Sequence, residues 1–185
     1  MTNSILGEVG QKMKTAVVGT LKGTDEVYDT IFETVRGNVV SLLSGTGDVT
    51  GTALNTVKDM VVGAIHAVGE IGVAAGTTIH DIVHATIKGV ADAGGDVGST
   101  VKDTVRGAIT GVSEVEGDVV AASVKAVQGA IAGVRDVGGD VGKATTDAVT
   151  GAIEAAGAIS ETTVKEVKDT LSESVDGAKD VIHKL

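Results

Sequence analysis

The residues best suited to chemistry in this sequence are two histidines one helical turn apart. His80 and His84 are separated by four positions, and Asp81 follows the first of them. In a helix this spacing places both imidazoles on one face, which is an arrangement used to bind zinc. A third ligand is missing nearby, and the HExxH sequence of zinc hydrolases does not occur. We therefore expect solvated histidines on a polar face rather than a metal site.

The other reactive side chains do not form a recognisable catalytic or cofactor-binding group. The stretch GDVGSTVKDTV at 95–105 is rich in glycine, but it lacks the GxxxxGK[ST] sequence and the preceding strand of a phosphate-binding loop. Serine and threonine are abundant without a Ser/His/Asp grouping, and the sequence contains no cysteine. We therefore expect no catalytic, cofactor-binding or metal-ligating residues, and we expect that the protein is not an enzyme.

Composition and charge limit the number of domains, the cellular compartment and the kinds of molecule that the protein can bind. The chain has 185 residues, which suits one domain, and a net charge of −10, which opposes binding to the phosphates of nucleic acid. The absence of cysteine is typical of a reducing compartment. The first residues, MTNSILGEVGQKMK, lack the basic start and apolar run of a secretory signal. We expect a cytoplasmic protein and leave membrane association open.

The elements that carry these residues are organised as a 22-residue repeat. The triplet GDV begins at 95, 117 and 139, and eight units that start at Gly7 fill 7–182 without an insertion. Position 11 of the unit is valine in seven units and leucine in the eighth, and position 20 is acidic in all units except at Ala158. Self-similarity at a fixed period is the mark of a repeat architecture. We treat 1–185 as a single repeat region.

The spacing of the apolar positions predicts helices. These residues recur at positions 3, 7, 11, 15, 18 and 21 of the unit, at intervals of three or four. Six turns in each unit give about 3.67 residues per turn, the value of an 11-residue (hendecad) repeat, which favours right-handed or straight packing. A β-solenoid with one coil per unit is the alternative fold, because valine, threonine and glycine are abundant.

Glycine accompanies the apolar stripe at two positions of the unit. The sequence holds 27 glycines and no proline, and positions 13 and 17 are small in most units, as at Gly107, Gly111, Gly129 and Gly133. Glycine costs a helix roughly 1 kcal/mol relative to alanine, but it lets two helix backbones approach closely. The small residues at positions 13 and 17 leave a notch in the surface of the helix. We expect this notch to face another helix in side-by-side packing.

Three glycine-rich points are the weakest places of the predicted helix, at 44–52, 94–95 and 138–139. At the last two, the aspartate of GGDV is suited to cap a new helix. The sequence therefore predicts an all-α fold of long amphipathic helices, arranged as a coiled coil or as a bundle of helical hairpins. Hairpins of roughly 40-residue helices and a single rod of about 275 Å both satisfy the pattern.

The most apolar stretch is MVVGAIHAVGEIGVAAGTTI at 60–79, where Glu70 is the one formal charge. About twenty such residues are enough to cross a bilayer. Because this stretch keeps the repeat register and contains no leucine or phenylalanine, we expect it to be the most apolar repeat rather than a membrane span.

In its period and composition, the sequence resembles known families of helical proteins. The segments TVKDTVRGAITGV (100–112) and AVVGTLKGTDEV (16–27) are similar to the lipid-binding repeats of synucleins and to late-embryogenesis-abundant (LEA) proteins. Their phase also resembles that of hendecad coiled coils. These resemblances extend over nearly the whole chain, and they imply a non-enzymatic role in lipid-surface binding or stress protection.

Two functions fit this sequence. The first is that of a structural protein whose repeat helices self-assemble into an oligomer or filament, so that the partner is another copy of the chain. The second is that of an amphipathic-helix protein that binds a membrane or lipid surface. The acidic charge and an aromatic content of 1 % favour the first, since interfacial helices are typically rich in Trp, Phe, Lys and Arg. We expect no cofactor and no nucleic-acid partner in either case.

Overall fold

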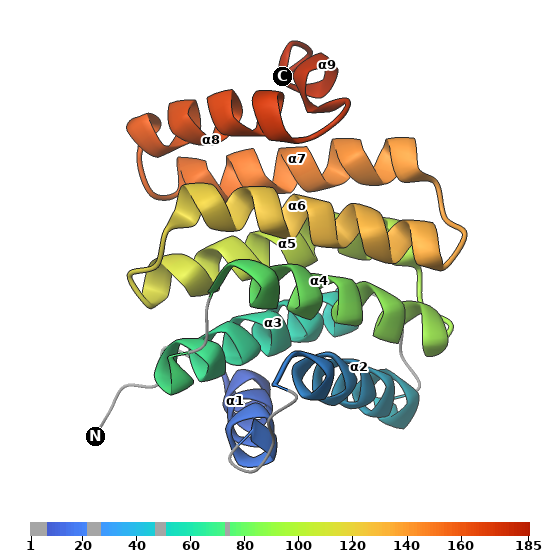
Figure 1. Cartoon of the computed structure of the whole chain (residues 1–185). Helices are drawn as coiled ribbons and strands as arrows, with labels where there is room; N and C mark the ends of the chain where they lie inside the picture. Colours follow the sequence, from blue (N-terminus) through green and yellow to red (C-terminus); the bar gives the residue numbers. More distant parts are fainter. Residues whose placement is uncertain (1–6, 22–26, 47–50, 73–74) are drawn as a thin grey trace.

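A computed structural model describes residues 7–21, 27–46, 51–72 and 75–185 of the chain. This described part is all-α, as predicted, and its helices pack into a compact bundle without any strand (Figure 1). The helices are α1 (Glu8–Leu21), α2 (Val27–Thr46), α3 (Gly51–Ile71), α4 (Ala75–Asp92), α5 (Val97–Glu114), α6 (Val119–Asp136), α7 (Val141–Gly157), α8 (Glu161–Ser174) and α9 (Ala178–Ile182).

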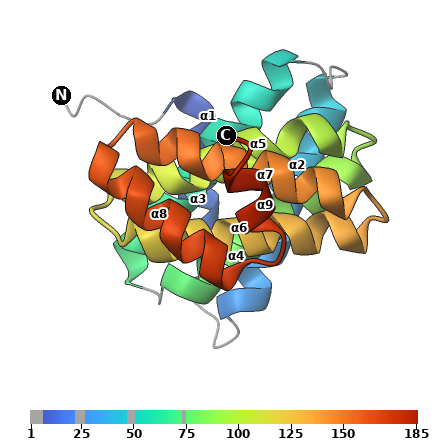
Figure 2. The ribbon, with the colours of Figure 1, turned by 90° about the horizontal axis from the view of Figure 1, so that it is seen from above.

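Helices α3 to α7 each pack mainly on the helix two places earlier in the chain. The most extensive contacts join α1 to α3, α2 to α4, α3 to α5, α4 to α6 and α5 to α7. Odd-numbered and even-numbered helices therefore form two stacks that lie side by side, and consecutive helices make the contact between the stacks. Helices α1 and α2 lie at one end of this arrangement and α8 and α9 at the other (Figures 1 and 2).

The helices are shorter than predicted, because a stop and a start signal lie at the unit boundaries from 94 onward. The longest helices of the described part, α2 and α3, have 20 and 21 residues. After α4, the amide of Gly95 donates to the carbonyl of Val90 over 2.8 Å, the long-range bond of a Schellman C-cap. Asp96 then accepts a bond of 2.9 Å from the amide of Gly98 and caps α5.

The same boundary recurs after α5 and α6, where Asp118 and Asp140 cap the next helices. Position 22 of the unit, just before this boundary, has a positive φ: it is 77° at Gly94, 73° at Gly138 and 56° at Glu116. A left-handed residue reverses the chain at little cost when it is glycine. Of the sequence-predicted breaks, 94–95 and 138–139 lie between helices, whereas 47–50 within 44–52 lie outside the described residues.

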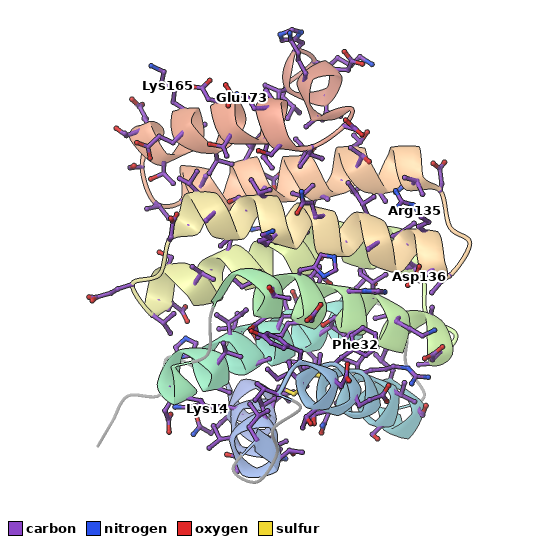
Figure 3. All side chains as sticks on the ribbon, viewed as in Figure 1. Lys14, Phe32, Arg135, Asp136, Lys165 and Glu173 are labelled. Atoms are coloured by element: carbon purple, nitrogen blue, oxygen red, sulfur yellow. The ribbon has the colours of Figure 1, made fainter. Side chains whose placement is uncertain are left out.

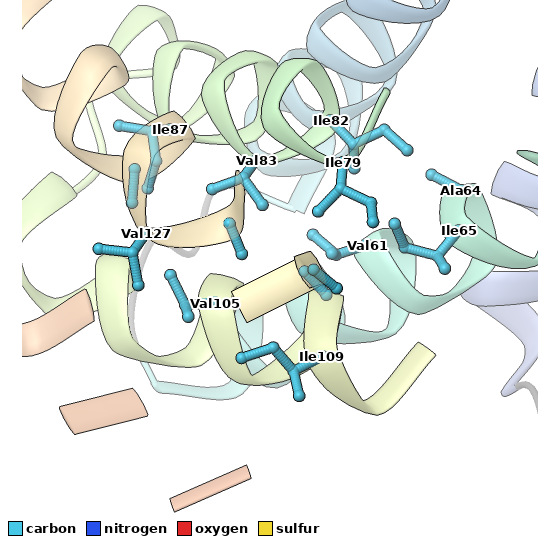
Figure 4. Close-up of a cluster of buried hydrophobic side chains, with 14 of the residues drawn as sticks. Val61, Ala64, Ile65, Ile79, Ile82, Val83, Ile87, Val105, Ile109 and Val127 are labelled. Atoms are coloured by element: carbon cyan, nitrogen blue, oxygen red, sulfur yellow. The ribbon is translucent and has the colours of Figure 1, made fainter. Parts of the chain in front are cut away.

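The apolar stripe of the repeat forms the core of this fold. Position 11 is at most 1 % exposed in every unit, and Val61, Val83, Val105 and Val127 meet at the centre of the bundle (Figure 4). Isoleucine, valine and alanine fill the surrounding space, so a core forms with almost no aromatic bulk. Since one chain buries its own stripe, the bundle needs no second chain to cover it.

The apolar stretch 60–79 belongs to this core. Val61 and Ala64 in α3 and Ile79 in α4 are between 0 and 3 % exposed. Among the described residues, no helix combines the length and the apolar character needed to cross a membrane.

Glycines at positions 13 and 17 allow the helices of one stack to approach. A Cβ built on Gly151 in α7 would lie 2.6 Å from the carbonyl oxygen of Lys102 in α5, and one on Gly133 in α6 would lie 2.8 Å from Cβ of Ile87 in α4. Gly129 packs in the same way on the backbone of His80. The notch therefore faces another helix, as predicted, and that helix belongs to the same chain.

Replacing Gly151 by alanine is expected to destabilise the fold although alanine is the better helix former. The new methyl group would press on the α5 backbone and cost about 1–3 kcal/mol, which outweighs a helix-propensity gain of about 1 kcal/mol. Urea denaturation of the full chain, followed by circular dichroism, measures the change.

Gly37→Ala is the matched control, because nothing lies within 4 Å of a Cβ built on Gly37 in α2. This variant is expected to gain roughly 0.5–1 kcal/mol of stability. Equal stabilisation of both variants would show that Gly151 has no close helix neighbour.

Candidate functional site

The two histidines predicted to be solvated lie partly buried between helices. Nδ1 of His80 is 3.0 Å from Oδ1 of Asp81, and the rings of His80 and His84 meet edge to face with centroids 5.9 Å apart. The ring of His84 also contacts Phe32 of α2, at 5.1 Å. Its Nε2 is 2.8 Å from Oδ2 of Asp136 in α6 but has no hydrogen-bond partner among the described residues.

This arrangement does not assemble a metal centre in the described part of the chain. There, no group of three or more His, Cys, Asp or Glu side chains converges as metal ligands would. His80 and His84 each face a different carboxylate, and those carboxylates belong to different helices. His84 instead links neighbouring helices, because its ring on α4 contacts Phe32 of α2 and lies beside Asp136 of α6.

The acidic residues at position 20 form the main electrostatic feature of the stacks. Four of them, in α3 to α6, lie in the last turn of their helices, where a negative charge opposes the helix dipole. Each of these four carboxylates faces a lysine, arginine or histidine side chain on the helix two places earlier. The pairs are Lys14–Glu70 (2.6 Å), Arg36–Asp92 (2.6 Å), His66–Glu114 (2.7 Å) and His84–Asp136 (2.8 Å).

The basic partner shifts along its helix with the register of the stack. Gly63 in α3 packs on Gly10, which is position 4 of its unit, whereas Gly107 in α5 packs on Lys58, which is position 8. In the first two pairs the base accordingly occupies position 8, and in the later pairs it is found at position 12 or 16. The shift from position 8 at Arg36 to position 12 at His84 matches a one-turn change of register between the α2–α4 and α4–α6 contacts, whereas His66, at position 16, lies a further turn along its helix.

The guanidinium of Arg36 contacts two carboxylates. Its hydrogen bond to Asp92 and the charge of that carboxylate raise the pKa of the guanidinium further above its ordinary value. Glu33, one turn away on α2, adds a second, longer ion pair of 3.3 Å. Arg36 is therefore held between its own helix and α4.

One end of the bundle leaves its stacking positions uncovered. Positions 13 and 17 are buried in α3 to α7, whereas Gly19 in α1 and Ser41 and Gly45 in α2 are exposed. Nothing in the described part of the chain lies within 4 Å of a Cβ built on Gly19 or Gly45. The reason is topological: α1 and α2 have no helix two places earlier to pack on.

The opposite end of the bundle is closed. Helix α9 packs on both α7 and α8. The outer side of α8 carries charged residues, among them Lys165 and Glu173, which project away from the bundle (Figure 3). The two ends therefore differ, one being polar and capped and the other presenting small residues without a partner.

Comparisons with known proteins do not identify a family for this chain. No protein-family model matches the sequence, and no curated protein is significantly similar to it. The candidate sites therefore rest on the geometry described above. The main one is the uncovered stacking face, made of Gly19, Ser41 and Gly45.

The ion pairs between stacked helices are expected to couple weakly. Lys102 Nζ in α5 lies 2.5 Å from Glu154 Oε1 in α7, and both side chains are more than a third exposed. A double-mutant cycle with Lys102→Met and Glu154→Gln should give a coupling of about 0.2–1 kcal/mol that decreases with salt. Zero coupling at low salt would mean that the pair does not form in solution.

Proposed function

We propose that this protein is a non-enzymatic structural protein that self-associates through its uncovered stacking face. The observation that carries the proposal is the contrast between units: positions 13 and 17 hold a stacked helix in α3 to α7, whereas Gly19 in α1 and Ser41 and Gly45 in α2 stand open. Helical glycine that is exposed to water costs roughly 1 kcal/mol per residue relative to alanine. A close helix partner offsets this cost elsewhere in the fold, and a second copy would offset it here.

The partner we favour is the same face of a second copy. The opposite end is occupied by α9 and by the charged side of α8, so it offers no matching row of small residues. Two identical faces related by a two-fold axis form a closed dimer. The hendecad phase of the repeat favours right-handed or straight packing where the helices of the two copies meet. A filament would need a second contact, at the α8 end.

Lipid binding, the second function that fits the sequence, requires a different state of the chain. The apolar stripe that would lie on a membrane is buried in the bundle, as at Val61 and Val105, both 0 % exposed. The helices would have to separate before the stripe could contact lipid. Helix separation would also break the ion pairs between stacked helices, such as Arg36–Asp92.

Gly45→Lys is expected to abolish self-association while leaving the helical content unchanged. A long charged side chain in the stacking face would separate the two copies and place a charge where water is excluded. Sedimentation velocity over a range of concentrations measures the change in mass. The wild-type chain should show a concentration-dependent dimer, and the variant should remain a monomer.

Gly37→Lys supplies the control, since Gly37 lies on the same helix, is equally open and is outside the stacking positions. It adds the same charge and should dimerise like the wild type. A wild-type chain that is monomeric at all concentrations would contradict the proposal. Binding to lipid vesicles together with loss of the bundle would favour the lipid-binding alternative instead.

A further inference from the structure

A groove of about 450 Å³ lies where the repeat ends, between α4, α6, α7 and the link from α8 to α9. This volume falls within the range of roughly 300–1,000 Å³ in which proteins bind small molecules. Its apolar floor includes Ile131, Val141 and Val175, and its walls include Arg135 and Asp176. The groove is distinct from the stacking face on α1 and α2.

The groove exists because the last unit departs from the repeat. Where earlier units continue a helix, Val175 is extended and Gly177 adopts a φ of 81°, so the chain turns away from α6. The edge of the opening is held by Gln128, whose side-chain amide donates to the carbonyl of Ser174 over 3.4 Å. The opening is therefore a consequence of a specific turn with its own hydrogen bond.

The walls of the groove carry two charges of opposite sign that lack partners. In the described part of the chain, neither Arg135 nor Asp176 forms an ion pair or a side-chain hydrogen bond, and both side chains are exposed. Arg135 differs in this respect from basic residues between stacked helices such as Arg36, which faces a carboxylate. Arg135 also occupies position 19, which is uncharged in the three units before it.

We propose that this groove binds a small zwitterion with an aliphatic body, such as a free α-amino acid. Arg135 presents a planar guanidinium that can hold a carboxylate through two parallel hydrogen bonds. Asp176 can accept hydrogen bonds from an ammonium group, and the floor of Ile131, Val141 and Val175 accommodates an aliphatic side chain. A zwitterion uses both unpaired charges, whereas a simple anion would be repelled by Asp176 and by the net charge of −10.

Titration of the full chain with L-leucine, followed by NMR chemical shifts, tests the assignment. Leucine should bind saturably, while N-acetyl-leucine, leucinamide and glycine, each lacking one of the three groups, should bind at least about tenfold more weakly. Arg135→Gln and Asp176→Asn should each weaken leucine binding by a similar factor. These exposed substitutions are expected to leave the circular dichroism spectrum unchanged.

Matched controls lie on the same elements outside the groove, Lys125→Gln on α6 and Asp180→Asn on α9, and they should bind leucine like the wild type. Three results would overturn the proposal: no saturable binding of leucine, equal binding of N-acetyl-leucine, or equal binding by the Arg135 and Asp176 variants. Equal binding of N-acetyl-leucine would identify the groove as an anion site.

Discussion

The close approach of each helix to the helix two places earlier is the contact on which this fold depends. It is set by glycine at positions 13 and 17, as at Gly133 against Ile87 and Gly151 against Lys102. The roughly 1 kcal/mol that each such glycine costs a helix is offset by burial of the valine and isoleucine on either side. Without that approach the two stacks could not share one core.

The helix caps at the unit boundaries set the helix length that allows this contact to repeat along the chain. Asp96, Asp118 and Asp140 begin helices of 17 or 18 residues, and a left-handed residue two positions before each aspartate ends the preceding helix. From α5 onward, position 13 of one unit lies beside position 8 of the unit two places earlier, as at Gly107 and Lys58. Because each stacking contact is made with the helix two places earlier, the first two helices have no such partner and keep an uncovered face.

Helical class, period, buried positions and aspartate caps could all be predicted from the sequence, because each is a local property of one unit. Helix length could not: the sequence shows paired glycines at 94–95 and 138–139, but the equivalent turn has Glu116 in the left-handed position and a single glycine, Gly117, after it, so the sequence did not mark it as a break. The partner of the notch was also ambiguous, since a glycine row facing a helix of the same chain looks the same as one facing another chain.

The candidate sites were harder to predict because they arise where the repeat is interrupted. The uncovered face at Gly19 and Gly45 depends on which helix comes first, and the groove depends on the turn at Gly177. Two of the ion pairs had a signal in the sequence, namely acid at position 20 and base at position 8, whereas His66 and His84 lie at positions 16 and 12. Pairing them required knowing that the helices stack two apart, as Arg36 and Asp92 show.

Disulfide cross-linking tests most directly whether the helices stack within one chain. A Cβ built on Gly111 in α5 would lie 3.0 Å from Cβ of Ile65 in α3, close to the separation of about 3.5–4.5 Å that a disulfide requires. The chain has no cysteine of its own, so Ile65→Cys/Gly111→Cys introduces a single pair. Oxidation at low protein concentration should give a cross-linked monomer. Cross-linked dimers, or no cross-link, would contradict intramolecular stacking.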